Sequence, residues 1–240
     1  MPSLRARLAN LAARLLVKRV TNAARFDLKR VRRAMASRLT MPALLPRSVR
    51  VEPSQAPALR GEWLRPQDAM PGAVLLFIHG GGFIAGAPRT HRSFTAWLAK
   101  ESGVAVFALQ YRLAPEHPYP AGLDDCVAAV RALRAQGLRV IIGGDSAGGN
   151  LAIATALRLR EAGEELPLGL MLVCPVTDFT DASESLRSNA VREPLLGLRH
   201  RRYAFGLYAG STSLTDPLLS PVYADLRGMP PMIVEASRIE

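Results

Sequence analysis

The chain contains little cysteine and no long apolar run. Its 240 residues include only Cys126 and Cys174, too few for the disulfide framework of a small secreted domain. Both stand in apolar stretches, so we interpret them as core residues in a reducing compartment and expect a cytoplasmic protein. No stretch of about twenty apolar residues occurs, so no membrane-spanning helix is expected. Arginines also interrupt the N-terminus, where a signal peptide needs a continuous apolar core.

Acidic residues are scarce at the start of the chain. The first fifty positions hold thirteen of the 31 lysines and arginines but only one of the 20 acidic residues, Asp27. The formal net charge of +11 therefore comes from this segment, and the rest of the chain is close to neutral. Nucleic-acid enzymes carry basic residues over the surface that does the work. Here the basic residues form an appendage, and we expect no nucleic-acid partner.

The basic segment has the pattern of an amphipathic helix. Leu4, Leu8, Leu11 and Leu15 fall on one helical face. Residues 1–47 are therefore predicted to form basic N-terminal helices. Two interpretations stay open: the leucines pack on the rest of the protein, or residues 3–39 contact an anionic membrane surface, which would make the protein membrane-associated.

From residue 48 onwards, short apolar runs alternate with helical stretches. The expected strands are Ala73–Ile78, Val104–Leu109, Val140–Ile142, Leu168–Val173 and Met232–Val234, preceded by two short ones around Val49–Val51 and Gly61–Leu64. The expected helices are His91–Glu101, Asp124–Gln136 and Ala147–Ala162. This order predicts an α/β fold with a mostly parallel sheet covered by helices on both faces. The polar stretch at about 180–215 is predicted to be a lid-like insertion in a 48–240 core.

A nucleophile motif lies between an expected strand and an expected helix. Gly144-Asp145-Ser146-Ala147-Gly148 matches G-x-S-x-G, which in this setting forms a sharp turn that exposes the serine hydroxyl. The glycines permit the turn, and the following helix directs N–H groups and its positive dipole end towards the site. Asp145 is expected to hold neighbouring loops.

A second glycine-rich turn follows the strand that ends at Ile78. In His79-Gly80-Gly81-Gly82-Phe83, consecutive glycines let the main chain approach a substrate and present its N–H groups. Ester hydrolases use such groups as an oxyanion hole, together with the N–H after the nucleophile, here that of Ala147. The loop lacks the lysine and hydroxyl of a phosphate-binding P-loop, so the phosphate interpretation is rejected.

The chain resembles the hormone-sensitive-lipase-like family of α/β-hydrolases, which includes many bacterial esterases. The resemblance covers roughly residues 60 to 240 and rests on the following four segments: HGGGF at 79–83, YRLAPEHPYPA at 111–121, GDSAGGN at 144–150 and DPLLSP at 216–221. It implies a serine carboxylesterase or lipase of lipid metabolism that acts on small-molecule esters. Residues 1–47 and the insertion near 180–215 would together form a helical cap over the acyl pocket.

The resemblance also implies roles for single residues. Ser146 would form an acyl-enzyme, Gly81, Gly82 and Ala147 would supply the oxyanion-hole N–H groups, and His79 would hold the glycines. Glu240 falls where the family has its catalytic acid. The family histidine, with a final strand and helix, would follow Glu240, and this sequence ends there.

Among the four histidines, His200 is the only one after Ser146, but its cationic neighbours predict a solvent-facing position on the cap. A catalytically inactive, truncated hydrolase-fold protein with a binding role therefore remains the alternative. No metal-ligand spacing and no cofactor motif occurs, so neither metal nor cofactor is expected. Asp124 and Asp125 are expected to cap a helix.

Overall fold

The computed structural model describes residues 27–39, 45–189 and 197–237. Its sheet has seven strands in the order β1-β2-β4-β3-β5-β6-β7. The strands are β1 (Val49–Ala56), β2 (Leu59–Pro66), β3 (Ala73–Ile78), β4 (Ala105–Leu109), β5 (Arg139–Asp145), β6 (Leu170–Val173) and β7 (Met232–Glu235). The helices are α3 (Leu28–Leu39), α4 (Pro88–Ser102), α5 (Ala121–Ala135), α6 (Ala147–Glu161), α7 (Glu184–Ser188), α8 (Leu198–Ala209) and the 3-10 turn η2 (Pro221–Tyr223).

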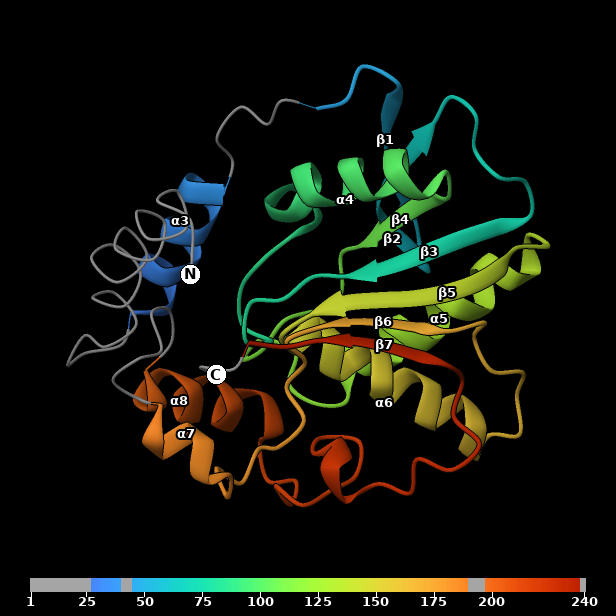
Figure 1. Cartoon of the computed structure of the whole chain (residues 1–240). Coiled ribbons are helices and arrows are strands. Elements are labelled where there is room, and N and C mark those ends of the chain that lie inside the picture. Colours follow the sequence, from blue (N-terminus) through green and yellow to red (C-terminus); the bar gives the residue numbers. More distant parts are fainter. Residues whose placement is uncertain (1–26, 40–44, 190–196, 238–240) are drawn as a thin grey trace.

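The sheet is mostly parallel, as the sequence predicts. Strands β4, β3, β5, β6 and β7 run parallel, whereas β1 and β2 pair antiparallel at one edge. Pro53 lies within β1, which is tolerated because an edge strand has one side without ladder hydrogen bonds. Helix α4 covers one face of the sheet, and α5 and α6 cover the other (Figure 1).

Strand β3 shows why the sheet needs helices on both faces. All six of its residues are buried. Val74, Leu76 and Ile78 belong to the core on the α5 and α6 side, while Leu75 and Phe77 pack into the smaller core on the α4 side. Because successive side chains of a strand point to opposite faces, an apolar run of this length is stable only between two helical layers.

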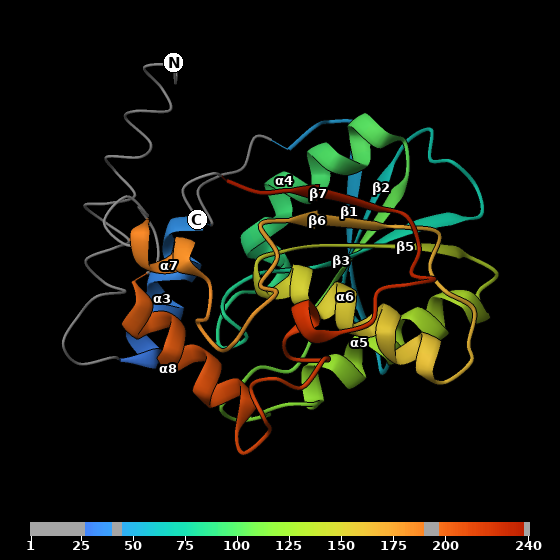
Figure 2. The same cartoon turned by 60° about the horizontal axis from the view of Figure 1, so that its bottom comes forward.

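Three helices gather at the carboxyl ends of the parallel strands. Figures 1 and 2 show α3, α7 and α8 together at this end of the molecule. The leucine stripe at residues 4–15 lies outside the described part of the chain, so the cap of residues 1–47 and 180–215 remains a prediction. Of the described helices, none combines the length and apolar character needed to cross a membrane.

Candidate active site

Ser146 occupies a strained turn between β5 and α6. Its φ of 52° and ψ of −117° lie where residues with a Cβ are rarely found. Main-chain bonds hold the turn: Ser146 N–H donates to the Val173 carbonyl over 2.9 Å, and the Ser146 carbonyl accepts from Asn150 and Val176 N–H, each over 3.1 Å. This is the backbone geometry of a nucleophile elbow.

The glycines on either side of Ser146 leave no room for a side chain. A Cβ on Gly144 would lie 2.5 Å from the Gly148 carbonyl oxygen, and a Cβ on Gly148 would overlap the carbonyl of Ile78. Since Ile78 ends β3, the same close approach brings the elbow against the start of the glycine-rich loop. The turn therefore requires glycine for space at both positions.

The glycine-rich loop carries N–H groups without acceptors. Gly81 and Gly82 have φ values of 130° and 62°, and within the described residues neither N–H donates a hydrogen bond. Ala147 is the first residue of α6, where N–H groups have no intrahelical acceptor. The loop lies under α8, because a Cβ on Gly82 would be 3.4 Å from the Ala204 Cβ. The three predicted oxyanion donors thus belong to two adjoining turns.

Asp145 joins these two turns. Its carboxylate accepts the Gly80 N–H over 2.8 Å and lies 3.3 Å from His91 Nε2. His91 Nδ1 lies 2.9 Å from the Thr90 hydroxyl, which fixes the ring at the start of α4. Burial alone would raise the pKa of Asp145, but the hydrogen bond and positive charge of His91 and the Gly80 N–H outweigh it and lower the pKa. The sequence reasoning did not identify His91 as part of this arrangement.

The buried ring of His79 holds the start of the glycine-rich loop. It stacks on Tyr111 with centroids 4.5 Å apart, and the Tyr111 hydroxyl donates to the His79 carbonyl over 2.9 Å. Burial lowers the pKa of His79 to about 4, so the ring is neutral at pH 7. Its Nδ1 lies 2.8 Å from the Gly80 carbonyl and acts there as the donor.

Aromatic rings connect the loop to the helix above it. Phe83 has a φ of 65° and stacks on Tyr208 of α8 with centroids 4.1 Å apart. Phe179 stacks on Phe205 of the same helix over 4.2 Å. Both Phe83 and Tyr208 are fully buried. Helix α8 therefore packs on the residue that follows the last glycine of the loop.

The remaining candidates do not meet Ser146. His200 is buried in α8, which contradicts the predicted solvent-facing position, and its burial lowers its pKa. His117 is exposed in the loop before α5. In the part of the chain that the structure describes, no side chain hydrogen-bonds to the Ser146 hydroxyl, and no cluster of His, Cys, Asp and Glu could hold a metal. Glu240 lies outside the described residues.

Asp124 and Asp125 do not cap a helix as expected. Helix α5 begins three residues earlier, at Ala121, and no side chain caps it. Instead the Asp125 carboxylate accepts the main-chain N–H of Arg112 over 2.8 Å and pairs with the guanidinium of the same residue. This carboxylate fixes the loop before α5.

Sequence comparison links the chain to known hydrolases. A family described as having the alpha/beta hydrolase fold matches residues 75–239. An acetyl-hydrolase of Streptomyces hygroscopicus is 40% identical over 184 residues, which cover 75% of this chain and 60% of that protein. An esterase of Acinetobacter venetianus is 38% identical over 197 residues, which cover 80% and 65%. The chain thus spans less than two thirds of the length of either relative.

Solved structures agree with this assignment. The crystal structure of an esterase from the bacterial hormone-sensitive lipase family superposes with a TM-score of 0.90 at 34% identity, covering 100% of this chain and 80% of that one. The crystal structure of EstE5 soaked with ethyl alcohol gives a TM-score of 0.92 at 30% identity with the same coverages.

Mouse hormone-sensitive lipase is 34% identical over 170 residues, which cover 68% of this chain and 21% of that protein.

Proposed function

Because the chain belongs to the hormone-sensitive-lipase-like family of α/β-hydrolases, we propose that it hydrolyses carboxylic esters through an acyl-enzyme on Ser146. One observation carries this proposal: the strained turn at Ser146 adjoins a loop whose Gly81 and Gly82 N–H groups lack acceptors within the described residues. Such donors are suited to an oxyanion that exists only during the reaction.

The chemistry follows from these groups. The Ser146 Oγ attacks the ester carbonyl, and the N–H groups of Gly81, Gly82 and Ala147 stabilise the tetrahedral oxyanion. Each such donor contributes about 3 kcal/mol to transition-state stabilisation. Collapse of the intermediate releases the alcohol and leaves an ester on Ser146, which water then hydrolyses.

Activation of Ser146 needs a general base oriented by a carboxylate. We propose Glu240 as this carboxylate, on the family resemblance. In the triad order of this fold the acid precedes the histidine in the sequence, so the base would be a histidine that follows the acid. Asp145 and His91 would position the oxyanion loop rather than transfer protons.

The relatives suggest the substrate class. They are an acetyl-hydrolase and an esterase, which supports esters with short acyl chains as substrates. We propose α3 and α8 as parts of the cap over the acyl pocket, since Arg32 of α3 hydrogen-bonds the Ile84 carbonyl and α8 packs on Phe83. Contact of residues 3–39 with a membrane remains a separate proposal.

Hydrolysis of p-nitrophenyl acetate and butyrate tests the function. In protein that includes the proposed histidine base, we expect turnover that disappears in Ser146→Ala and persists in Ser188→Ala, which removes an exposed serine hydroxyl on α7. A fluorophosphonate should add one label, on Ser146, detectable by peptide mass spectrometry. Folded protein that neither turns over the esters nor accepts the label would reject the proposal and favour a binding role.

A further inference from the structure

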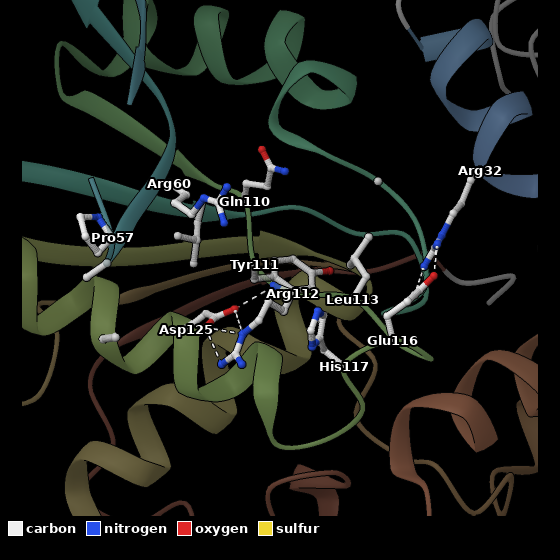
Figure 3. Close-up of a pocket in the computed structure, with 14 residues that line it drawn as sticks. Arg32, Pro57, Arg60, Gln110, Tyr111, Arg112, Leu113, Glu116, His117 and Asp125 are labelled. Atoms are coloured by element: carbon white, nitrogen blue, oxygen red, sulfur yellow. Dashed lines mark hydrogen bonds and ion pairs between the residues drawn. The ribbon is translucent and has the colours of Figure 1, made fainter. Parts of the chain in front are cut away.

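A cavity that Ser146 does not line lies beside the loop that follows β3. Its volume is about 530 Å³, within the range of small-molecule sites. The cavity is lined by residues of α3, the β1–β2 turn, β2, β4 and the segment after it, and α5, together with Gly86 of the loop before α4 (Figure 3). Ser146 and the loop glycines Gly80, Gly81 and Gly82 do not line it. The cavity is therefore distinct from the proposed catalytic centre.

Among the charged side chains that line this cavity, one arginine has no carboxylate partner in the described part of the chain. Glu116 is bound by Arg32, with both oxygens 2.7 Å from guanidinium nitrogens, and Asp125 is bound by Arg112 over 2.8–3.0 Å. Arg60 is the third arginine of the lining, and in the described part of the chain its guanidinium makes no hydrogen bond or ion pair. The lining therefore has an excess of one positive charge, at Arg60.

The side-chain amide of Gln110 lies near this cation (Figure 3). Gln110 N–H donates to the Arg60 carbonyl over 2.9 Å, so the two residues are neighbours, and Figure 3 shows their side chains at the same end of the cavity. His117 adds an exposed imidazole to the lining. An anion at Arg60 would thus have the Gln110 amide as a further hydrogen-bond donor.

The rest of the wall is apolar. Leu109, Leu113, Ala128 and Pro57 line the cavity beside the polar groups. A ligand that uses both parts has one negative charge and a hydrocarbon tail. A carboxylate matches a single guanidinium in charge and in its bidentate geometry, whereas a phosphate dianion would leave one charge uncompensated.

We propose that this cavity binds an amphiphilic monocarboxylate, with its head group on Arg60 and its hydrocarbon tail against Leu109, Leu113 and Ala128. The proposal does not depend on ester hydrolysis, because no lining residue takes part in the proposed reaction. It assigns to the molecule a small-molecule site separate from the proposed catalytic centre, next to the Tyr111 ring that stacks on His79.

Titration calorimetry with octanoate tests this site. The Ser146→Ala protein serves as the background, so the result does not depend on whether the catalytic site is active. We expect saturable binding that weakens about tenfold in Arg60→Gln and less in Arg60→Lys. Arg139→Gln removes a different exposed arginine, on β5, and should leave binding within about twofold of the parent protein.

Two further ligands and one further variant sharpen the test. Octanol lacks the charge and acetate lacks the tail, so both should bind more weakly than octanoate. Ala128→Phe fills the apolar wall without removing a charge and should also weaken binding, with the thermal melt reporting whether the variant folds. Absence of saturable octanoate binding, or equal binding to the Arg60→Gln and parent proteins, would overturn the proposal.

Discussion

The turns around Ser146, where we propose that the chemistry takes place, and helix α8, which packs on them, are held by different contacts. Around Ser146 the turns are held by main-chain hydrogen bonds and by the Asp145 carboxylate, and a single Cβ on Gly144 or Gly148 would meet a carbonyl. Helix α8 is held mainly by side chains, in stacked aromatic pairs and in the ion pair between Arg201 and Asp181, and a Cβ on its Gly206 would meet no atom within 4 Å. One region tolerates no added atom, and the other has open space on its outer side.

This difference suits the two tasks. Oxyanion donors act through geometry, so if Gly81 and Gly82 have the proposed role, small displacements of their N–H groups would cost much of the transition-state stabilisation. A covering helix needs only to shape a pocket, and packed side chains can be exchanged with partial relaxation. We therefore expect substitutions in the turns to cause large losses of folding stability or activity, and substitutions in α8 to cause smaller, graded losses.

Gly148→Ala should have the largest effect. The new Cβ would overlap the Ile78 carbonyl, which ends the central strand β3 and cannot move freely. We expect a loss of at least about 4 kcal/mol in the free energy of unfolding, or no folded protein. The matched change Gly206→Ala, at an exposed position of α8, should stabilise by about 0.5–1 kcal/mol. Urea unfolding of both variants measures this, and equal effects would remove the contrast between the regions.

Acidification should lower the free energy of unfolding because His79 is buried in its neutral form. Its pKa is lowered from 6.5 to about 4, so the unfolded chain takes up the proton before the folded one does. The contribution of the neutral His79 ring to the free energy of unfolding is complete above pH 6.5. It falls by about 3 kcal/mol as the pH drops from 6.5 to 4. Unfolding free energies across this range should show that loss in the parent and in His117→Gln, and a smaller one in His79→Gln. Identical pH profiles of the unfolding free energy for all three proteins would contradict the assignment of this loss to His79.

Much of this architecture could be predicted because its determinants are local. The run Ala73–Ile78 is apolar on both faces and forms β3 at the predicted boundaries. The motif at 144–148 spans the end of β5 and the start of α6, with Ser146 between them, where G-x-S-x-G needs to be. Helices α4 and α5 begin three residues before the predicted starts, at Pro88 and Ala121. Proline is favoured in the first turn of a helix because its missing N–H has no intrahelical acceptor there, so Pro88 was a signal for the start of α4 that the prediction did not use.

Contacts distant in sequence could not be predicted. His91 and Asp145 are 54 positions apart and meet because α4 packs beside the carboxyl end of the sheet, which no local pattern records. His200 was a different kind of error. Its arginine neighbours suggested exposure, but His200, Ala204 and Tyr208 recur every fourth residue and share the buried face of α8. That periodicity was present in the sequence.

His91→Ala should reduce turnover without unfolding the protein. Loss of the ring frees the Asp145 carboxylate, which also accepts the Gly80 N–H, so the oxyanion loop loses one of its fixed points. We expect kcat to fall about tenfold with little change in KM, because the oxyanion contact forms only in the transition state. Arg89→Gln, an exposed change on the same helix, is the control. A rise in KM at constant kcat would show that His91 acts on substrate binding instead.

The smallest effect is expected where α3 meets the core. Arg32 and Glu116 are partly exposed, with 32% and 55% of their side chains accessible, so the pair should contribute less than about 1 kcal/mol at pH 7. The hydrogen bond from Arg32 lowers the pKa of Glu116 to about 2. This contribution is complete above pH 4.5 and disappears as the pH falls from 4.5 towards 2. The difference in unfolding free energy between the parent and Glu116→Gln should therefore be small at pH 7 and vanish near pH 2. A difference of several kcal/mol at pH 7 would mean that the stability of the protein is as sensitive to substitution at the contact of α3 with the core as in the turns around Ser146.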